Sequence, residues 1–182
     1  GNVKAVNAGT ATITATLGKV SATFTVTVKN PSITAKADSS VIYTKSKTTT
    51  KINVVKDGVT GNATFRSSNT KVATVSANGT VKAKKAGKVN ITVQVGNYKQ
   101  VVKITVKKPT MKLVKSSAKL KKGKKVTIKV KAAPVSKVTF KSSNKKVATV
   151  SSKGVVKAKK KGTAIITVKC NGITKKFKVT VK

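Results

Sequence analysis

The sequence contains no histidine, no tryptophan, a single cysteine and only two carboxylates, Asp38 and Asp57. Without histidine or a neighbouring pair of acids, the chain lacks the usual general bases of enzyme catalysis. The chain also has few ligands for metal ions, because hard cations bind clustered carboxylates and zinc binds cysteine or histidine. We therefore expect no catalytic residue, no metal site and no cofactor in this chain.

Two serine–lysine pairs match the spacing of a known nucleophile motif. They are Ser68-x-x-Lys71 and Ser143-x-x-Lys146. That motif requires a helix, which places the lysine beneath the serine. Both pairs lie in sequence typical of a turn between strands, so they do not predict a catalytic serine.

The lone cysteine, Cys170, excludes a disulfide within the chain, so any core must hold by packing alone. Cys170 occupies the same phase as Val95 and Leu17 in related segments. This position predicts a small buried apolar side chain. A reactive thiol is the alternative interpretation.

Long hydrophobic runs are also missing. No apolar run approaches the roughly 18 residues of a membrane span, and the start does not resemble a signal peptide. We therefore predict no transmembrane segment. Hydrophobic residues still make up 38% of the chain, in short alternating runs that can form a core.

An internal repeat organises what is present. Residues 64–107 match residues 139–182 without a gap, with about 25 of about 44 positions identical. Residues 1–29 match residues 79–107 in the same way. The sequence therefore predicts a truncated copy at 1–29, whose start lies inside a repeat, and two domain-sized copies at 30–107 and 108–182.

Within each copy the hydrophobic period is two. Phe177, Val179 and Val181 alternate with polar residues, which predicts a strand with one buried face. Asn171-Gly172 supplies the two residues of a tight hairpin just before it. Each full copy therefore predicts about seven short strands and no helix, an all-β antiparallel sandwich.

A set of spaced residues carries a family resemblance. The pattern is Phe65-x-Ser-Ser-Asn, Val72-Ala-Thr-Val, Gly79-x-Val-x-Ala, Gly87 and Ile91-Thr-Val, and it repeats from Phe140. It resembles the bacterial immunoglobulin-like domain, group 2, over essentially the whole chain, although that family often has tryptophan where Phe65 and Phe140 stand. The resemblance implies tandem immunoglobulin-like sandwiches without catalytic residues. It also implies a spacer, stalk or adhesion segment outside the cell, at the surface or wall of a bacterium.

Positive charge is extreme and unevenly distributed. The 41 Lys and Arg against 2 Asp and Glu give a net charge of +39. By segment it is +3 for residues 1–29, +12 for residues 30–107 and +24 for residues 108–182. Because such charge costs self-repulsion, it favours an anionic partner such as a cell-wall polymer, an acidic glycan or a membrane surface.

Nucleic acid is a poor fit as that partner. All cations except Arg66 are lysines, which read base edges poorly, and aromatics make up only 3% of the chain. We therefore expect no sequence-specific binding of nucleic acid.

The candidate polyanion contacts lie at the end of the chain: Lys157, Lys159, Lys160, Lys161, Lys176 and Lys178. The competing interpretation is structural. Val156 and Ala158 fall on the inward phase, so the lysines between and after them could be a solvated strand face that discourages edge pairing. The first copy has Lys4-Ala-Val-Asn-Ala-Gly9 at this place, so the fold does not require the lysines.

Residues 1–29 supply only the closing strands of a sandwich. Their apolar face is predicted at Ile13, Leu17, Phe24, Val26 and Val28. An isolated hairpin is marginal in water, so this face should be covered by a second copy of the chain, an adjacent domain or an upstream segment. Covering by a second copy would make residues 1–29 a self-association joint. Otherwise they are the stump of a longer stalk.

Three functions remain open at this point. The chain could be a non-enzymatic stalk or adhesion segment, or a polyanion-binding module that docks on a cell wall through residues 108–182. A carbohydrate-processing enzyme is possible only if its catalytic domain precedes residue 1.

Overall fold

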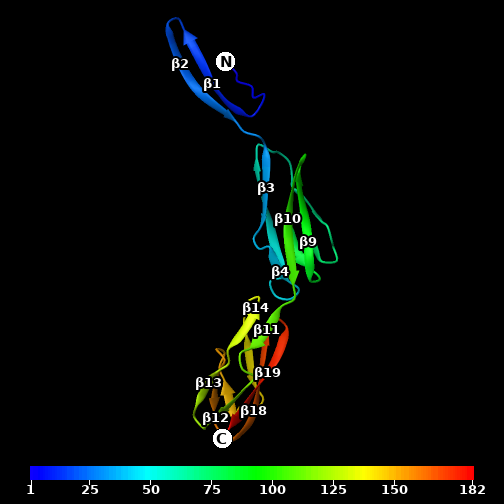
Figure 1. Ribbon diagram of the computed structural model, residues 1–182, viewed down its shortest axis with the longest axis vertical. Helices are drawn as coiled ribbons and strands as arrows, with labels where there is room; N and C mark the ends of the chain where they lie inside the picture. Colours follow the sequence, from blue (N-terminus) through cyan, green and yellow to red (C-terminus); the bar gives the residue numbers. More distant parts are fainter.

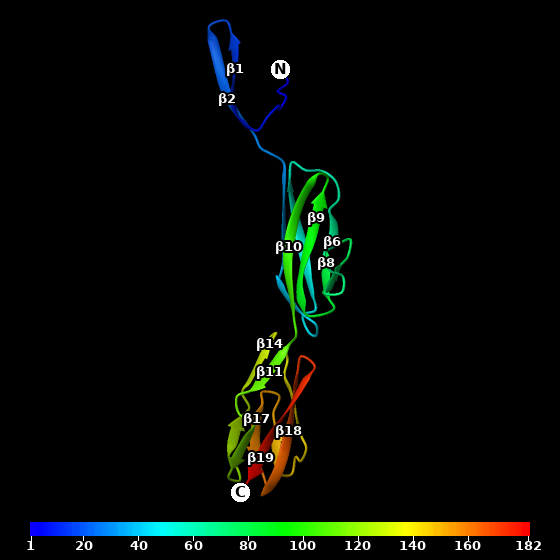
Figure 2. The same ribbon diagram turned by 45° about the vertical axis from the view of Figure 1, so that its right-hand side comes forward.

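The computed structural model describes residues 1–182 as strands and connections, without a helix. A hairpin and two sandwiches follow one another end to end, so the molecule is a rod with its termini far apart (Figures 1 and 2). The links are short: residues 29–31 join the hairpin to the middle sandwich, and residues 108–109 join the two sandwiches. No helix that could cross a membrane is present.

The hairpin consists of β1 (Gly9–Leu17) and β2 (Val20–Val28), which pair only with each other. Its register places Ile13 opposite Phe24 and Ala11 opposite Val26, so one face is entirely apolar. The other face carries only serine and threonine, as in the opposed pair Thr12 and Thr25. A hairpin with one apolar and one polar face corresponds to the two central strands of a sandwich sheet.

The middle sandwich shows what normally covers this face. Its matching strands bury Val95 fully and leave Val102 8% exposed, whereas the hairpin leaves the corresponding Leu17 87% and Phe24 52% exposed. The expected hairpin is therefore present, but the adjacent domain does not cover its apolar face. A second sheet is missing on that side.

The middle sandwich is built from eight strands in two four-stranded sheets. One sheet has the order β4-β10-β9-β6 and the other β3-β5-β8-β7. The strands are β3 (Ser32–Ala37), β4 (Val41–Tyr43), β5 (Thr49–Asp57), β6 (Thr64–Ser67), β7 (Ala73–Val75), β8 (Thr80–Ala83), β9 (Gly87–Val95) and β10 (Tyr98–Lys107).

The C-terminal sandwich repeats this plan with nine strands. One sheet has the order β12-β19-β18-β15, and the facing layer consists of β13-β17-β16 together with the pair β11-β14. The strands are β11 (Thr110–Leu113), β12 (Ser117–Leu120), β13 (Lys125–Thr127), β14 (Val130–Ala133), β15 (Thr139–Ser142), β16 (Ala148–Val150), β17 (Val155–Ala158), β18 (Gly162–Cys170) and β19 (Ile173–Val181).

The all-β sandwich prediction is confirmed, with two corrections. Strand counts exceed seven because the first strand of each copy divides between the two sheets, and β13 and β14 are one strand interrupted at Ile128 and Lys129. The pairing is also not wholly antiparallel. β4 runs parallel to β10 and β12 parallel to β19, because the divided strand keeps its direction when it changes sheet.

Each sandwich has its own core, and no buried residue is shared between them. The alternation predicted for β19 is confirmed: Phe177, Val179 and Val181 are buried while Lys176 and Lys178 are exposed. Cys170 is buried as an unpaired thiol, as its phase predicts. Asn171 and Gly172 both have positive φ, which is the geometry of a tight two-residue hairpin turn.

A glycine opposite an aromatic ring recurs in both sandwiches. Gly154 has a φ of +77°, and a Cβ there would lie 2.8 Å from Cζ of Phe140. Gly79 stands in the same relation to Phe65, with a φ of +82° and 2.9 Å. The ring occupies the space that a side chain would need, so this turn requires glycine in both copies.

The dry face of β19 gives a direct test of the packing. Val181→Lys should unfold the C-terminal sandwich, because an unpaired buried charge costs about 3–5 kcal/mol and a small domain has roughly 5 kcal/mol in total. Lys178→Glu, on the exposed face of the same strand, should leave the melting temperature nearly unchanged. Thermal melting of the full chain followed by circular dichroism distinguishes the two. Equal melting of both variants would contradict the assigned faces.

Candidate functional site

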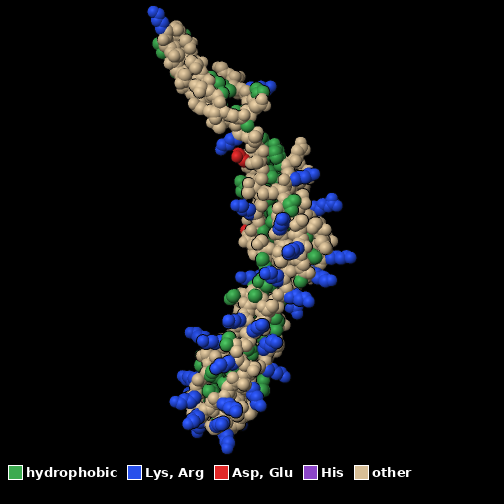
Figure 3. Space-filling model, in the orientation of Figure 1, with side chains coloured by type: hydrophobic (Ala, Val, Ile, Leu, Met, Phe, Trp, Pro, Cys, Tyr) green, Lys and Arg blue, Asp and Glu red, His purple; other side chains and the backbone are tan.

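The end of the C-terminal sandwich farthest from the hairpin carries a dense group of lysines, which we call the distal tip. Lysine and arginine side chains crowd this part of the molecule and are sparse on the hairpin (Figure 3). No carboxylate side chain lies in residues 108–182. The tip comprises nine exposed lysines: Lys121, Lys122, Lys124, Lys145, Lys146, Lys159, Lys160, Lys161 and Lys182.

Backbone hydrogen bonds hold the tip loops together. The Gly123 amide donates to Ala158 O at 2.9 Å, and the Ala158 amide donates to Lys124 O at 3.0 Å. The Lys159 amide then donates to Val147 O at 2.8 Å, which joins a third loop. The Lys182 amide, just after β19, donates to Leu120 O at 2.9 Å. Three loops and the end of β19 are therefore fixed beside one another, although their lysines are far apart in sequence.

The six predicted contact lysines do not share one surface. Lys159, Lys160 and Lys161 belong to the distal tip. Lys157 lies on the outer face of the layer β13-β17-β16, whereas Lys176 and Lys178 lie on the outer face of the opposite sheet. The structure brings Lys176 and Lys178 together and separates them from Lys157 by the thickness of the sandwich.

The competing structural interpretation needs a correction. Val156 and Ala158 are buried, as their phase predicts, but β17 lies between β13 and β16. Its lysine therefore cannot protect a sheet edge. Lys159 also lies beyond the end of β17, in the loop rather than on the strand.

Two pairs of lysines stand directly opposite each other on neighbouring strands. Lys125 faces Lys157, and Lys112 faces Lys131. In the middle sandwich Lys82, the counterpart of Lys157, instead faces Thr49 and Thr74. Like charges in this position destabilise a sheet, so the C-terminal copy carries an electrostatic cost that the middle copy avoids.

The matching loops of the middle sandwich are less charged and are placed differently. They carry six lysines: Lys45, Lys47, Lys71, Lys84, Lys85 and Lys107. This end also faces the next domain, since a Cβ on Gly172 would lie 3.0 Å from Cδ of Lys45. Within residues 1–182 no domain faces the distal tip in this way (Figure 1).

The serine–lysine pairs have a structural role. The Ser143 hydroxyl accepts the Ile165 amide at 2.9 Å, and the Ser68 hydroxyl accepts the Asn90 amide at 3.0 Å. Both serines lie in the turn that carries the chain from one sheet to the other, with no helix below them. The expectation of a turn rather than a catalytic pair therefore agrees with the geometry.

The carboxylates are also tied into loops or strand ends. Asp38 accepts a hydrogen bond from the Asn53 amide group at 2.7 Å, and Asp57 lies opposite Ser32 at the end of β5. No group of three or more potential metal-ligating side chains occurs in the chain.

Most of the tip escaped prediction from the sequence. Lys121, Lys122 and Lys124 follow a strand more than 30 residues before Lys159, and only the fold brings the two groups together. The sequence signal that could have identified the tip was the position of these lysines, since each of them follows or precedes a strand at the same end of the domain. Strand direction, which the sequence does not state, was needed to use it.

Known proteins match the chain in two ways. The family of bacterial Ig-like domains (group 2) matches residues 25–106 and 108–181. A kappa-carrageenase of Pseudoalteromonas carrageenovora is 50% identical over 66 residues, which are 34% of this chain and 17% of that enzyme. The chain therefore spans only a small part of the length of this curated relative.

Solved structures that match the chain include an S-layer protein and a fragment of intimin. The S-layer protein rSbsC(31-844) is 21% identical with a TM-score of 0.43, over 95% of this chain and 32% of that one. The C-terminal 282-residue fragment of intimin, solved with the intimin-binding domain of its translocated receptor, is 22% identical with a TM-score of 0.39. That match covers 83% of this chain and 64% of the fragment.

The opposed lysine pair predicts an effect of salt on stability. Lys125→Thr, which copies Thr49, should raise the free energy of unfolding by about 0.2–1 kcal/mol at low salt. The gain should shrink at high salt, because screening already weakens the repulsion. Lys82→Thr in the middle sandwich is the matched control and should change nothing. Denaturant melts at two salt concentrations measure both variants, and a Lys125→Thr gain that salt does not alter would contradict a charge effect.

Proposed function

Because the chain belongs to the bacterial Ig-like domain (group 2) family, we propose that it is a non-enzymatic stalk or adhesion segment of a secreted or surface-attached bacterial protein. The observation that carries this proposal is the end-to-end arrangement of separately packed sandwiches (Figure 1). Two residues, Lys108 and Pro109, make up the whole connection between them. A link of two residues limits how far apart the sandwiches can move, and domains joined end to end can hold what they carry at a distance from the surface.

The same segment could serve inside a larger enzyme. Its resemblance to part of a kappa-carrageenase is consistent with a module attached to a carbohydrate-processing domain. Residues 1–182 contain no histidine and no neighbouring carboxylates for such chemistry. In either setting we propose that the chain holds or positions another part of the protein, and that any catalysis occurs in that other part.

Scattering with mass determination tests the stalk. We expect a monomer with a radius of gyration well above the roughly 16 Å of a compact 182-residue domain. A compact particle would contradict a stalk. A dimer that reverts to monomer when residues 1–29 are removed would assign self-association to the hairpin, through the apolar face around Phe24. An oligomer that persists without residues 1–29 would exclude the hairpin as its cause.

A second function is favoured by the distal tip: docking on an anionic polymer such as teichoic acid or an acidic glycan. Nine lysines with no carboxylate in their domain repel one another, and a polyanion would relieve that repulsion. Lysine suits diffuse attraction to phosphate, sulfate or carboxylate better than geometric recognition. The proposed contacts are the tip lysines, with Lys157, Lys176 and Lys178 on the flanking faces.

Polymer binding measured against salt tests the docking proposal. Residues 108–182 should retain most of the affinity for teichoic acid, heparin or kappa-carrageenan, and residues 30–107 should bind more weakly at equal salt. Their separate cores make the two fragments suitable for comparison. Binding should weaken steeply as salt rises, and neutral agarose should not bind. Equal affinities of the two fragments, or no retention at low salt, would contradict docking.

Charge-matched variants of the full chain locate the contact. Changing Lys159, Lys160 and Lys161 to Gln should reduce polymer affinity more than changing Lys141, Lys169 and Lys175, which are exposed lysines outside the proposed contacts, to Gln. Both triple variants remove three charges, so a difference reports position rather than net charge. Equal losses would indicate attraction by the whole domain instead of the tip.

A further inference from the structure

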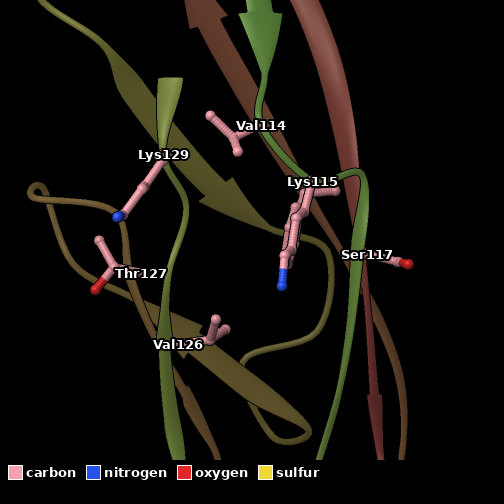
Figure 4. A pocket seen from close by; sticks show the side chains of 7 residues that line it. Val114, Lys115, Ser117, Val126, Thr127 and Lys129 are labelled. Carbon is pink, nitrogen blue, oxygen red and sulfur yellow. The ribbon is translucent and has the colours of Figure 1, made fainter. Parts of the chain in front are cut away.

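One side of the C-terminal sandwich is open. A gap of about 370 Å³ lies between the first strand and β13. Val114 and Val126 point toward it, and the side chain of Lys115 lies across it (Figure 4). The buried Phe177 also contributes to its lining, together with Ser117, Thr127 and Lys129.

In the middle sandwich the chain itself closes the corresponding place. There the Asp38 amide donates to Lys51 O at 2.9 Å, which continues the pairing of β3 with β5. The Ser39 amide then donates to Thr50 Oγ1, also at 2.9 Å. The Asp38 carboxylate in turn accepts the Asn53 side-chain amide at 2.7 Å. The backbone of Asp38, directly after β3, thus closes this corner, and its carboxylate is held at the edge.

The corner is open in the C-terminal copy because the first strand crosses to the opposite sheet earlier in the sequence than it does in the middle copy. Its last bond of this kind is from the Val114 amide to Lys129 O, at 3.0 Å. Ser116, the counterpart of Asp38, instead accepts the Lys178 amide at 2.9 Å, on the opposite sheet. The chain before β12 therefore pairs with β19, and β13 has no partner in the place where Asp38 pairs with Lys51.

The edge of β13 is therefore left without a neighbouring strand. The sheet order places β17 on one side of β13 and nothing on the other. Since the Ile128 amide donates to Gly154 O on the β17 side, the alternation of the backbone turns the N–H and C=O of Thr127 toward the gap. Free strand edges of this kind are places where another extended chain can pair.

We propose that this corner binds a short extended peptide that carries an apolar residue followed by a carboxylate. The peptide adds a strand beside β13 and exchanges backbone hydrogen bonds with Thr127. Its apolar side chain enters the gap between Val114 and Val126, and its carboxylate meets Lys129, which stands where Asn53 contacts Asp38.

The middle sandwich is the template for this occupant, and it favours a peptide over a sugar. The corner is closed there by backbone N–H groups spaced as in a strand, which a glycan does not possess. The counterpart of Asn53 is a lysine in the open copy, so an acidic residue gains an ion pair in addition to the strand pairing. The site is independent of polymer docking at the distal tip.

A capped pentapeptide of residues 37–41 with Ala37→Leu, Leu-Asp-Ser-Ser-Val, is the probe. Added to the isotope-labelled full chain, it should shift the amide signals of Val114, Lys115, Thr127 and Lys129, with no change at Lys51 in the closed copy. Hydrogen exchange of the Thr127 amide should slow as the peptide binds, because the amide gains a partner. The same peptide with Asp38→Asn should bind about two- to fivefold more weakly.

A filling variant gives the matched control. Val126→Phe should abolish the peptide-induced shifts by occupying the gap, whereas Val135→Phe, at an exposed apolar position in the same domain, should preserve them. Melting curves verify that both variants fold. If Val126→Phe does not fold, the peptide-induced shift of the Thr127 amide in the wild-type chain is the deciding measurement. Shifts spread over the tip lysines, equal binding by an Asp38→Lys peptide, or no change at millimolar peptide would overturn the proposal. A heparin disaccharide that shifts Thr127 where the peptide does not would reassign the corner to acidic sugars.

Discussion

Everything in this chain depends on covering one face of a long β-hairpin. The hairpin of residues 9–28 and its counterparts β9–β10 and β18–β19 share the same apolar stripe. Where a second sheet lies against it, the stripe becomes a core: Val93 and Val168 are fully buried. Where no sheet is present, Phe24 and Leu17 stay in water. Burial of apolar surface, the dominant favourable term in folding, is available only in the two complete copies.

Charge acts against this packing. The C-terminal sandwich places lysine opposite lysine on adjacent strands and gathers nine more at one end, with no carboxylate nearby. A small domain without disulfides has little stability to spare. The middle sandwich has the same fold with fewer cations, so the fold itself does not require the lysine-rich surface of the C-terminal sandwich. The proposed anionic partner would account for both the amount of charge and its position.

A small difference in the path of the chain distinguishes two otherwise similar domains. In the middle copy the first strand stays with β5 as far as Asp38, whereas in the C-terminal copy Ser116 has already joined β19. The first arrangement seals the sandwich, and the second leaves an open edge beside β13. Two copies of one repeat can therefore have the same core arrangement and still differ in which strand edges are left free.

The alternation of residues such as Phe177, Val179 and Val181 determined the strands, their buried faces and the sandwich class, because a side-chain period of two can be read locally. The repeat likewise determined that residues 1–29 contain a hairpin, whereas its uncovered apolar face, with Leu17 and Phe24 exposed, was seen only in the structure. Only the tertiary structure decided which lysines are neighbours. Lys121 and Lys159 lie at the same end of the domain because β12 and β17 both run toward the distal tip, and Lys157 is separated from Lys178 because they belong to facing sheets. It also decided the open corner at Thr127, since the residue at which a strand changes sheet depends on competition between two partners, and neither partner is a neighbour in sequence.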